Sequence, residues 1–257
     1  MLPELIVLIA FIIGGIVHTV AGFGSALVTV TLTTLFIDIQ VATPLQAMAG
    51  LSLCIYIFYQ NRKHWLWFES LPLIAGVAAG IPFGTYALTS FPESIVLGCL
   101  AVVVLGYAVF DLIATRRRGQ DELIEEGVDE PKATRTQVGT ATIVGVLSGL
   151  LVGAFAAGGP PVVIYAAIRG WHKERFKSIL QSQFIFSGVF LLLWQAYYGL
   201  ITRTVGWFAL FAFPGLLAGV LAGRIIDRRI DHARFRKLVL GLLLVLGVTL
   251  LTRALAG

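Results

Sequence analysis

Apolar segments of about twenty residues, separated by short polar loops, recur along the whole 257-residue chain. This is the length that an α-helix needs to cross the hydrocarbon core of a bilayer. The chain is 58% hydrophobic and 13% charged, whereas about 25% of the residues of a soluble domain are charged. The pattern therefore predicts an all-α polytopic membrane protein. The apolar segments are 5–36, 41–60, 69–89, 94–114, 137–168, 176–201, 206–226 and 235–255.

Two of these segments, 5–36 and 137–168, are much longer than the others. A continuous helix of that length would measure about 48 Å, which is too long for one crossing and too short for two. Each segment is interrupted near its middle, by AGFGS at 21–25 and by AGGPPVV at 157–163. We therefore expect each to be a hairpin of two half-helices of about 15 residues each, which meet at a tip inside the membrane.

Nearly all Lys and Arg residues fall in four of the loops, and loops rich in these residues are typically cytoplasmic. Segment 137–168 lies between two such loops, so it must enter the membrane and return to the same side. If 5–36 does the same from the other side, the chain is an inverted repeat in which each half is a broken-helix hairpin plus three spans. The basic loops are 61–64, 115–135, 169–177 and 224–237.

Faint similarity between the halves supports a duplication. A shift of 135 positions places Gly24 on Gly159 and Gln46 on Gln181. A shift of 139 aligns two glycine triplets, whose spacing is typical of closely packed transmembrane helices. These are Gly76, Gly80 and Gly84, and Gly215, Gly219 and Gly223.

The expected organisation is a first repeat at 1–114 and a second at 136–257. Between them, the charged residues of 115–135 predict a flexible cytoplasmic linker.

The two interruptions are the predicted functional site. Glycines such as Gly24 and Gly159 permit sharp turns, and proline suits the first positions of a helix. A helix that begins inside the membrane exposes free N–H groups and the positive end of its dipole, which is favourable for an anion. Ser25 adds a hydroxyl donor at the first interruption. Close helix packing alone is an alternative explanation for both glycine-rich stretches.

Several further polar residues lie inside apolar segments, where polar groups are costly and often functional, and three of them are candidate site residues. Gln46 and Gln181 correspond under the repeat, which makes them candidate ligand contacts, although each is equally compatible with an interhelical hydrogen bond. His18 precedes the first interruption and is a candidate proton sensor, with a packing role as the alternative.

Several function classes are disfavoured by what the sequence lacks. No carboxylate falls in the middle of a span, which argues against a cation pump built on buried Asp or Glu. There is no Walker loop and no HExxH motif, so we expect no enzyme activity, no cofactor and no metal site. The basic residues lie in loops between spans and indicate topology, not nucleic-acid binding. The expected partners are a small anionic substrate and the lipid bilayer, with homo-oligomerisation left open.

Three stretches resemble the TauE/SafE family of membrane anion transporters: AGFGSALVTVTLTTLF at 21–36, GLLVGAFAAGGPPVVIYAAIRGWHKERFKSILQSQFIFSGVF at 149–190, and the glycine-rich third spans. The resemblance covers nearly the whole chain apart from 116–135. It implies a sulfur-oxyanion exporter of a bacterial-type inner membrane, because the family is associated with export of sulfite and of organosulfonates such as sulfoacetate. Carried over to this sequence, the family motifs imply a central site at Gly22, Phe23, Gly24, Ser25, Gly158, Gly159, Pro160 and Pro161.

The mechanism expected on these grounds is alternating access between two opposed hairpin tips. The alternatives are a passive anion channel, a transporter of another small organic anion, and a membrane module without transport activity.

Overall fold

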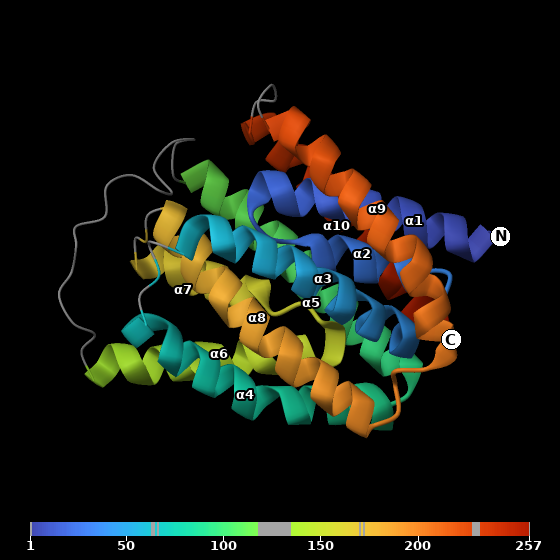
Figure 1. Ribbon diagram of the computed structural model, residues 1–257, viewed down its shortest axis with the longest axis horizontal. Helices are drawn as coiled ribbons and strands as arrows, with labels where there is room; N and C mark the ends of the chain where they lie inside the picture. Colours follow the sequence, from blue (N-terminus) through green and yellow to red (C-terminus); the bar gives the residue numbers. More distant parts are fainter. Residues whose placement is uncertain are drawn as a thin grey trace.

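The computed structural model describes residues 2–62, 65, 67–117, 135–169, 171, 173–227 and 232–256, which form α-helices and no strand (Figure 1). Eight of the helices are long and apolar enough to cross a membrane. The prediction of an all-α polytopic membrane protein is therefore confirmed. The helices are α1 (Leu2–Ala21), α2 (Ser25–Thr33), α3 (Ile39–Asn61), α4 (Trp67–Ser90), α5 (Glu93–Arg117), α6 (Arg135–Phe155), α7 (Gly159–Arg169), α8 (Lys173–Tyr197), α9 (Arg203–Asp227) and α10 (His232–Ala256).

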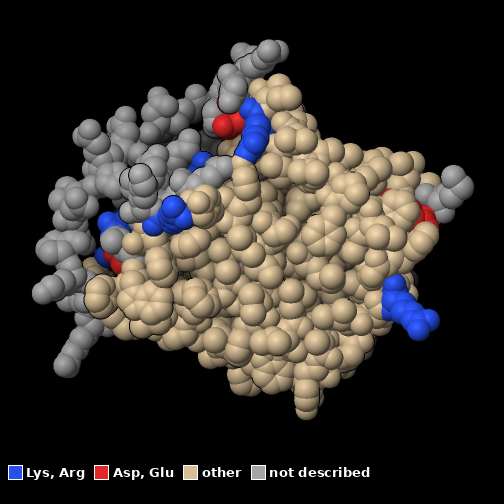
Figure 2. All heavy atoms as spheres, viewed as in Figure 1, with Lys and Arg blue, Asp and Glu red and all other residues tan. Residues whose placement is uncertain are grey.

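The surface of the helix bundle is suited to lipid. On the face shown in Figure 2, the Lys, Arg, Asp and Glu side chains lie toward the two ends and leave a broad uncharged belt between them. Large apolar side chains such as Phe83, Leu210 and Leu217 are exposed on the helices. Exposed apolar surface on this scale marks a membrane-facing protein. Of the predicted linker, residues 118–134 lie outside the described part of the chain.

Both long apolar segments are broken at the predicted stretches, but their arms are unequal. α1 has 20 residues and α2 has 9, while α6 has 21 and α7 has 11. The expectation of two half-helices of about 15 residues is therefore wrong. Each hairpin is one helix of spanning length followed by one short helix, because α1 and α6 begin at Leu2 and Arg135, before the apolar segments, and the breaks lie beyond the first 20 residues of each helix.

The short helix α2 is enclosed by protein. Seven of its nine residues are buried, and it packs against α1, α3 and α10. Leu27 and Val28 join a core cluster with Leu100 of α5 and Leu243 of α10. Irregular backbone at membrane depth is tolerated only where it is buried in protein or lines a cavity. The surroundings of α2 meet this requirement.

The predicted close packing at the glycine triplets is confirmed. A Cβ atom on Gly80 of α4 would lie 2.3 Å from the Val146 carbonyl oxygen of α6. A Cβ atom on Gly219 of α9 would lie 2.3 Å from the Ile12 carbonyl oxygen of α1. Two helix pairs, α4–α6 and α1–α9, therefore pack backbone against backbone.

The helix contacts have the pattern of a duplicated fold. α4 packs on α6 and α9 packs on α1, while α3 packs on α8 and α5 on α10. Exchanging α1–α5 for α6–α10 converts this set of pairs into itself. The two halves thus interlock through helices of both, with α3 and α8 side by side near the centre (Figure 1). The opposite orientation of the halves across the membrane stays a prediction.

Candidate functional site

The first break turns on two glycines with left-handed backbone. Gly22 has φ of 81° and Gly24 has φ of 95°, a region that other residues rarely adopt. Gly24 is the N-cap of α2 and makes no side-chain cap hydrogen bond. The first N–H that bonds back into the helix is that of Val28, which donates to the Gly24 carbonyl at 3.2 Å. The N–H groups of the first turn of α2 therefore have no partner within their own helix.

The second break is built differently from the prediction. The residue with left-handed backbone is Ala156, with φ of 52°, and not Gly158 or Gly159. Gly158 is required for space instead, because a Cβ atom there would lie 2.3 Å from Val152 Cγ2 and 2.6 Å from Ser148 Oγ. Its carbonyl accepts a hydrogen bond from the Ser148 hydroxyl at 2.6 Å.

The tip of the second hairpin also offers fewer donors than the first. α7 begins at Gly159 and continues with Pro160 and Pro161, which have no N–H group. The positive end of a helix dipole is thus accompanied by a full set of N–H donors only at the first tip.

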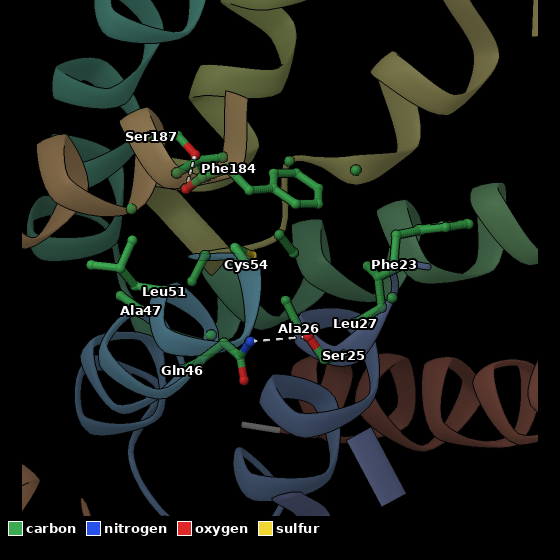
Figure 3. Close-up of a pocket in the computed structure, with 18 of the residues that line it drawn as sticks. Phe23, Ser25, Ala26, Leu27, Gln46, Ala47, Leu51, Cys54, Phe184 and Ser187 are labelled. Carbon is green, nitrogen blue, oxygen red and sulfur yellow. Dashed lines mark hydrogen bonds between the residues drawn. The ribbon is translucent and has the colours of Figure 1, made fainter. Parts of the chain in front are cut away.

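The two breaks meet at a shared cavity of about 60 Å³ (Figure 3). A Cβ atom on Gly159 would lie 3.4 Å from the Phe23 ring and 3.6 Å from Phe184 of α8. α3 and α8 supply the remaining walls. Of the predicted site residues, those that line the cavity are His18, Phe23, Gly24, Ser25, Gln46, Gly158, Gly159 and Pro160.

Three predicted residues lie outside this lining: Gly22, Pro161 and Gln181. Gly22 shapes the first turn, and a Cβ atom there would lie 3.3 Å from Lys177 Cε of α8. Gln181 is fully buried behind the first tip. Its amide nitrogen donates to the Gly22 carbonyl at 2.8 Å.

Buried hydrogen bonds fix the polar side of the cavity. Ser25 Oγ lies 2.9 Å from His18 Nδ1 and 3.4 Å from Gln46 Nε2. The Gln46 carbonyl oxygen in turn accepts a short hydrogen bond from the Thr29 hydroxyl. On the far side of the imidazole, His18 Nε2 lies 3.3 Å from Gln181 Nε2. One chain of polar groups therefore runs from α8 through α1 to the N-terminus of α2.

Sequence reasoning missed the helix faces that complete the cavity. On α3 the lining residues Gly50 and Cys54 follow Gln46 at steps of four, which places all three on one helix face. On α8 the lining residues Phe184, Ser187, Gly188 and Leu191 recur at similar steps. The step of four residues from Gln46 to Gly50 and Cys54 was the sequence signal that could have predicted the α3 wall of the cavity.

The cavity has a distinct electrostatic character. Among its described lining residues there is no Lys, Arg, Asp or Glu. Its polar groups are the N–H groups of α2, the hydroxyls of Ser25 and Ser187, the Gln46 amide and His18. In the described part of the chain, no cluster of His, Cys, Asp and Glu is arranged to hold a metal ion.

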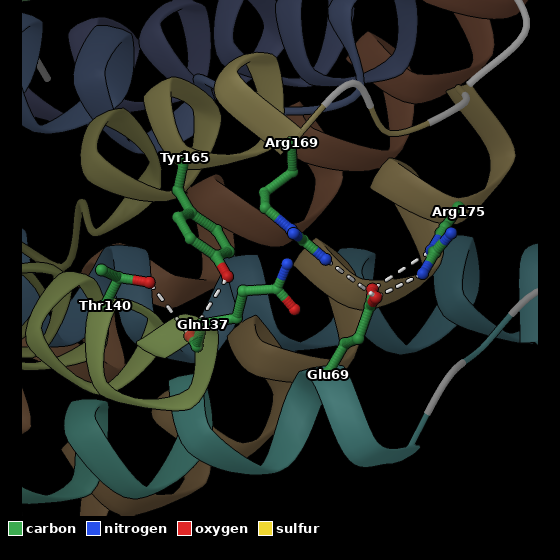
Figure 4. A network of polar contacts seen from close by, with 6 residues as sticks. All are labelled: Glu69, Gln137, Thr140, Tyr165, Arg169 and Arg175. Atoms are coloured by element: carbon green, nitrogen blue, oxygen red, sulfur yellow. Dashed lines mark hydrogen bonds and ion pairs between the residues drawn. The ribbon is translucent and has the colours of Figure 1, made fainter. Parts of the chain in front are cut away.

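A separate charged cluster lies at the ends of α4, α7 and α8 (Figure 4). The Glu69 carboxylate accepts two hydrogen bonds from the Arg175 guanidinium, one of them at 3.1 Å from Nε, and lies 3.8 Å from Arg169 Nη2. These side chains are only 13–16% exposed. The cluster ties the end of the short helix α7 to both neighbouring helices.

Comparisons with known proteins agree with this architecture. The family model described as Sulfite exporter TauE/SafE matches residues 6–250. A protein of Cupriavidus necator described as a probable sulfite/organosulfonate exporter TauE is 24% identical over 172 residues, which cover 63% of this chain and 67% of that protein. No solved structure matches the chain. Because the family model spans both hairpins and nearly the whole chain, the protein belongs to the TauE/SafE family of multi-pass membrane transporters.

Proposed function

We propose that this protein is an alternating-access carrier that exports sulfite or a small organosulfonate, such as sulfoacetate, across a bacterial-type inner membrane. The observation that supports this most directly is the cavity between the two helix breaks, into which α2 presents an uncapped N-terminus. The family match and the relative from Cupriavidus necator favour this substrate class. The proposal is transport without catalysis.

The chemistry of the cavity fits a small oxyanion. Sulfite and sulfonate oxygens accept hydrogen bonds, and the lining offers donors from the first turn of α2, from Ser25 and from the Gln46 amide. The helix dipole adds the equivalent of about half a positive charge at this end. The apolar walls strengthen these interactions, because their dielectric constant is low.

The size of the cavity favours a small solute. Its volume of about 60 Å³ is far below the roughly 300–1,000 Å³ of sites for drug-sized ligands. Sulfite and short sulfonates therefore suit it better than large organic anions.

Alternating access requires the cavity to open toward one side at a time. The glycine-packed pairs α1–α9 and α4–α6 are suited to move as rigid units, because their backbones are in direct contact. Relative motion of these pairs would separate Phe23 from Gly159 and expose the bound anion.

Reconstitution into liposomes tests the proposal. Wild-type protein should give saturable sulfite or sulfoacetate flux and counterflow, and Ser25→Ala should lower apparent affinity about tenfold, the cost of one hydrogen bond to a charged group. Ser52→Ala is the matched control, because the Ser52 hydroxyl bonds to Ala49 within α3 and is not part of the cavity lining. Flux without saturation or counterflow would identify a passive anion channel, and no flux of any small anion would refute transport.

A further inference from the structure

Gln181, His18 and Ser25 form a buried chain of polar groups beside the cavity. These residues are 0%, 2% and 3% exposed, and each comes from a different helix. Ser25 lines the cavity beside His18, whereas Gln181 does not. The direction of each hydrogen bond in this chain follows from the groups at its ends.

The direction is set first at Gln181. The Gly22 carbonyl can only accept a hydrogen bond, so the amide group 2.8 Å from it must be the NH₂ group. No partner of the Gln181 carbonyl oxygen is found among the described residues, so no competing contact favours a flipped amide. The second N–H of Gln181 is then available to the His18 Nε2 atom at 3.3 Å.

The tautomer of His18 follows from this contact. Because Nε2 faces a donor, it must carry the lone pair, and the proton of the neutral ring lies on Nδ1. His18 Nδ1–H therefore donates to Ser25 Oγ at 2.9 Å. The Gln46 amide nitrogen approaches the same oxygen at 3.4 Å, and the Gln46 carbonyl oxygen faces the Thr29 hydroxyl, which also lies 2.8 Å from the Ser25 carbonyl oxygen.

The hydroxyl proton of Ser25 is left without an acceptor in the described part of the chain. The oxygen receives two donors, and Ser25 borders the cavity at the first turn of α2. A hydroxyl whose oxygen accepts two hydrogen bonds directs its own proton elsewhere, and here the open direction is the cavity.

We propose that Gln181 and His18 are positioning residues that hold the Ser25 hydroxyl as a hydrogen-bond donor to the transported anion. The inference rests on the proposed function and makes it more specific. The cavity selects solutes that present only acceptor oxygens, such as sulfite and sulfonate, and Gln181 acts on them through His18 without touching them.

Nitrogen NMR of the histidines tests the direction of the hydrogen bonds without any transport assay. In ¹⁵N-histidine-labelled protein, the His18 signal, assigned by its loss in His18→Asn, should show the Nδ1–H tautomer. Gln181→Met keeps the length of the side chain and removes the donor, so this tautomer should lose its dominance. A wild-type His18 protonated on Nε2 would overturn the proposal.

A matched pair of variants tests the positioning role. Asparagine places its amide near the position of Nδ1, and glutamine places it near that of Nε2. We therefore expect His18→Asn to keep sulfite and sulfoacetate affinity within about threefold, and His18→Gln and Gln181→Met to lose about tenfold, as measured by calorimetry on folded protein in detergent. A merely structural role predicts equal losses for the two His18 variants, and that result would refute the inference.

Failure of the proposed function would look different. If wild-type protein bound neither anion, the proposed function and the ligand-donating role of Ser25 would both be wrong. The His18 tautomer would still be read separately from the NMR signal. Normal anion binding combined with an Nε2–H tautomer would refute this inference alone.

Discussion

At the scale of single residues, the adjacent glycines of the second break have different roles. Gly158 lies against Val152 and Ser148 with no room for a methyl group, whereas Gly159 faces Phe23 and Phe184 across the cavity at ordinary contact distances. Neither glycine has a left-handed backbone. Their difference is therefore one of space alone, and alanine substitutions separate the two roles.

Gly158→Ala should destabilise the protein by about 1–3 kcal/mol, the typical cost of overpacking a core, and should lower the unfolding temperature in detergent. Gly159→Ala should fold normally but narrow the cavity. It should reduce sulfoacetate flux more than sulfite flux in liposomes, because the larger anion needs the space. Equal stability of the two variants would contradict this assignment of roles.

The conformation of Ala156 could not be predicted from the sequence. A left-handed alanine costs roughly 1–2 kcal/mol, so the sequence GGPP pointed to its glycines for the turn. Tertiary packing overrides this preference: Ser148 binds the Gly158 carbonyl, and Gly158 fits closely against α6. The first break was predictable because Gly22 and Gly24 are the residues that turn the chain.

At the scale of helices, the pairs α4–α6 and α1–α9 pack closely through glycine-rich faces. Gly149 of α6 is an example, since a Cβ atom there would lie 2.4 Å from the Val77 carbonyl oxygen of α4. On α10, a Cβ atom on Gly241 would meet nothing within 4 Å. A valine substitution should therefore destabilise the protein at Gly149 and leave its stability almost unchanged at Gly241.

Gly149→Val should separate α4 from α6 and lower the yield of folded protein, with a loss of at least about 1–3 kcal/mol. Gly241→Val should leave the unfolding temperature within a few degrees of wild type. Fluorescence-detected size exclusion and thermal unfolding in detergent measure both effects. A stable, monodisperse Gly149→Val protein would show that α4–α6 contact is dispensable.

The glycine triplets were predictable because their spacing follows the helix repeat. The partners of α4 and α9 were not, because a glycine face does not specify which helix covers it. The role of Gln181 was also hidden, since its position under the repeat matches that of Gln46 although only Gln46 lines the cavity. In both cases the missing information is the arrangement of helices in space.

At the scale of the whole molecule, the basic loops predict an orientation. The ends of α3 and α9 at Arg62 and Asp227 should face the cytoplasm, and the α4–α5 and α8–α9 connections at Phe91 and Thr202 should face outward. Single cysteines at these four positions, in a background with Cys54 and Cys99 replaced by alanine, can be tested for reaction with a maleimide that does not cross the membrane. An impermeant maleimide added to intact cells should label only the outward pair. Labelling of Arg62→Cys from outside would refute the predicted inverted topology.

Transport of a net charge makes export sensitive to voltage. Moving one charge through 100 mV is worth about 2.3 kcal/mol, which corresponds to a concentration ratio of roughly 50. A monovalent sulfonate carried alone should therefore distribute across proteoliposomes in roughly this ratio when valinomycin clamps the potential at 100 mV. A distribution independent of voltage would indicate compensating movement of another ion.

The uncharged lining of the cavity bears on the return half of the proposed transport cycle. Because no described lining residue carries a full charge, the empty cavity of the proposed carrier would contribute no charge to the return step, and the membrane potential would act mainly on the step in which the anion is bound. The membrane potential would then accelerate the outward step with the anion bound and would leave the rate of the empty return step unchanged. The inside-negative potential of a cell would therefore favour release of the anion to the outside, and no fixed positive side chain among the described lining residues would hold it back.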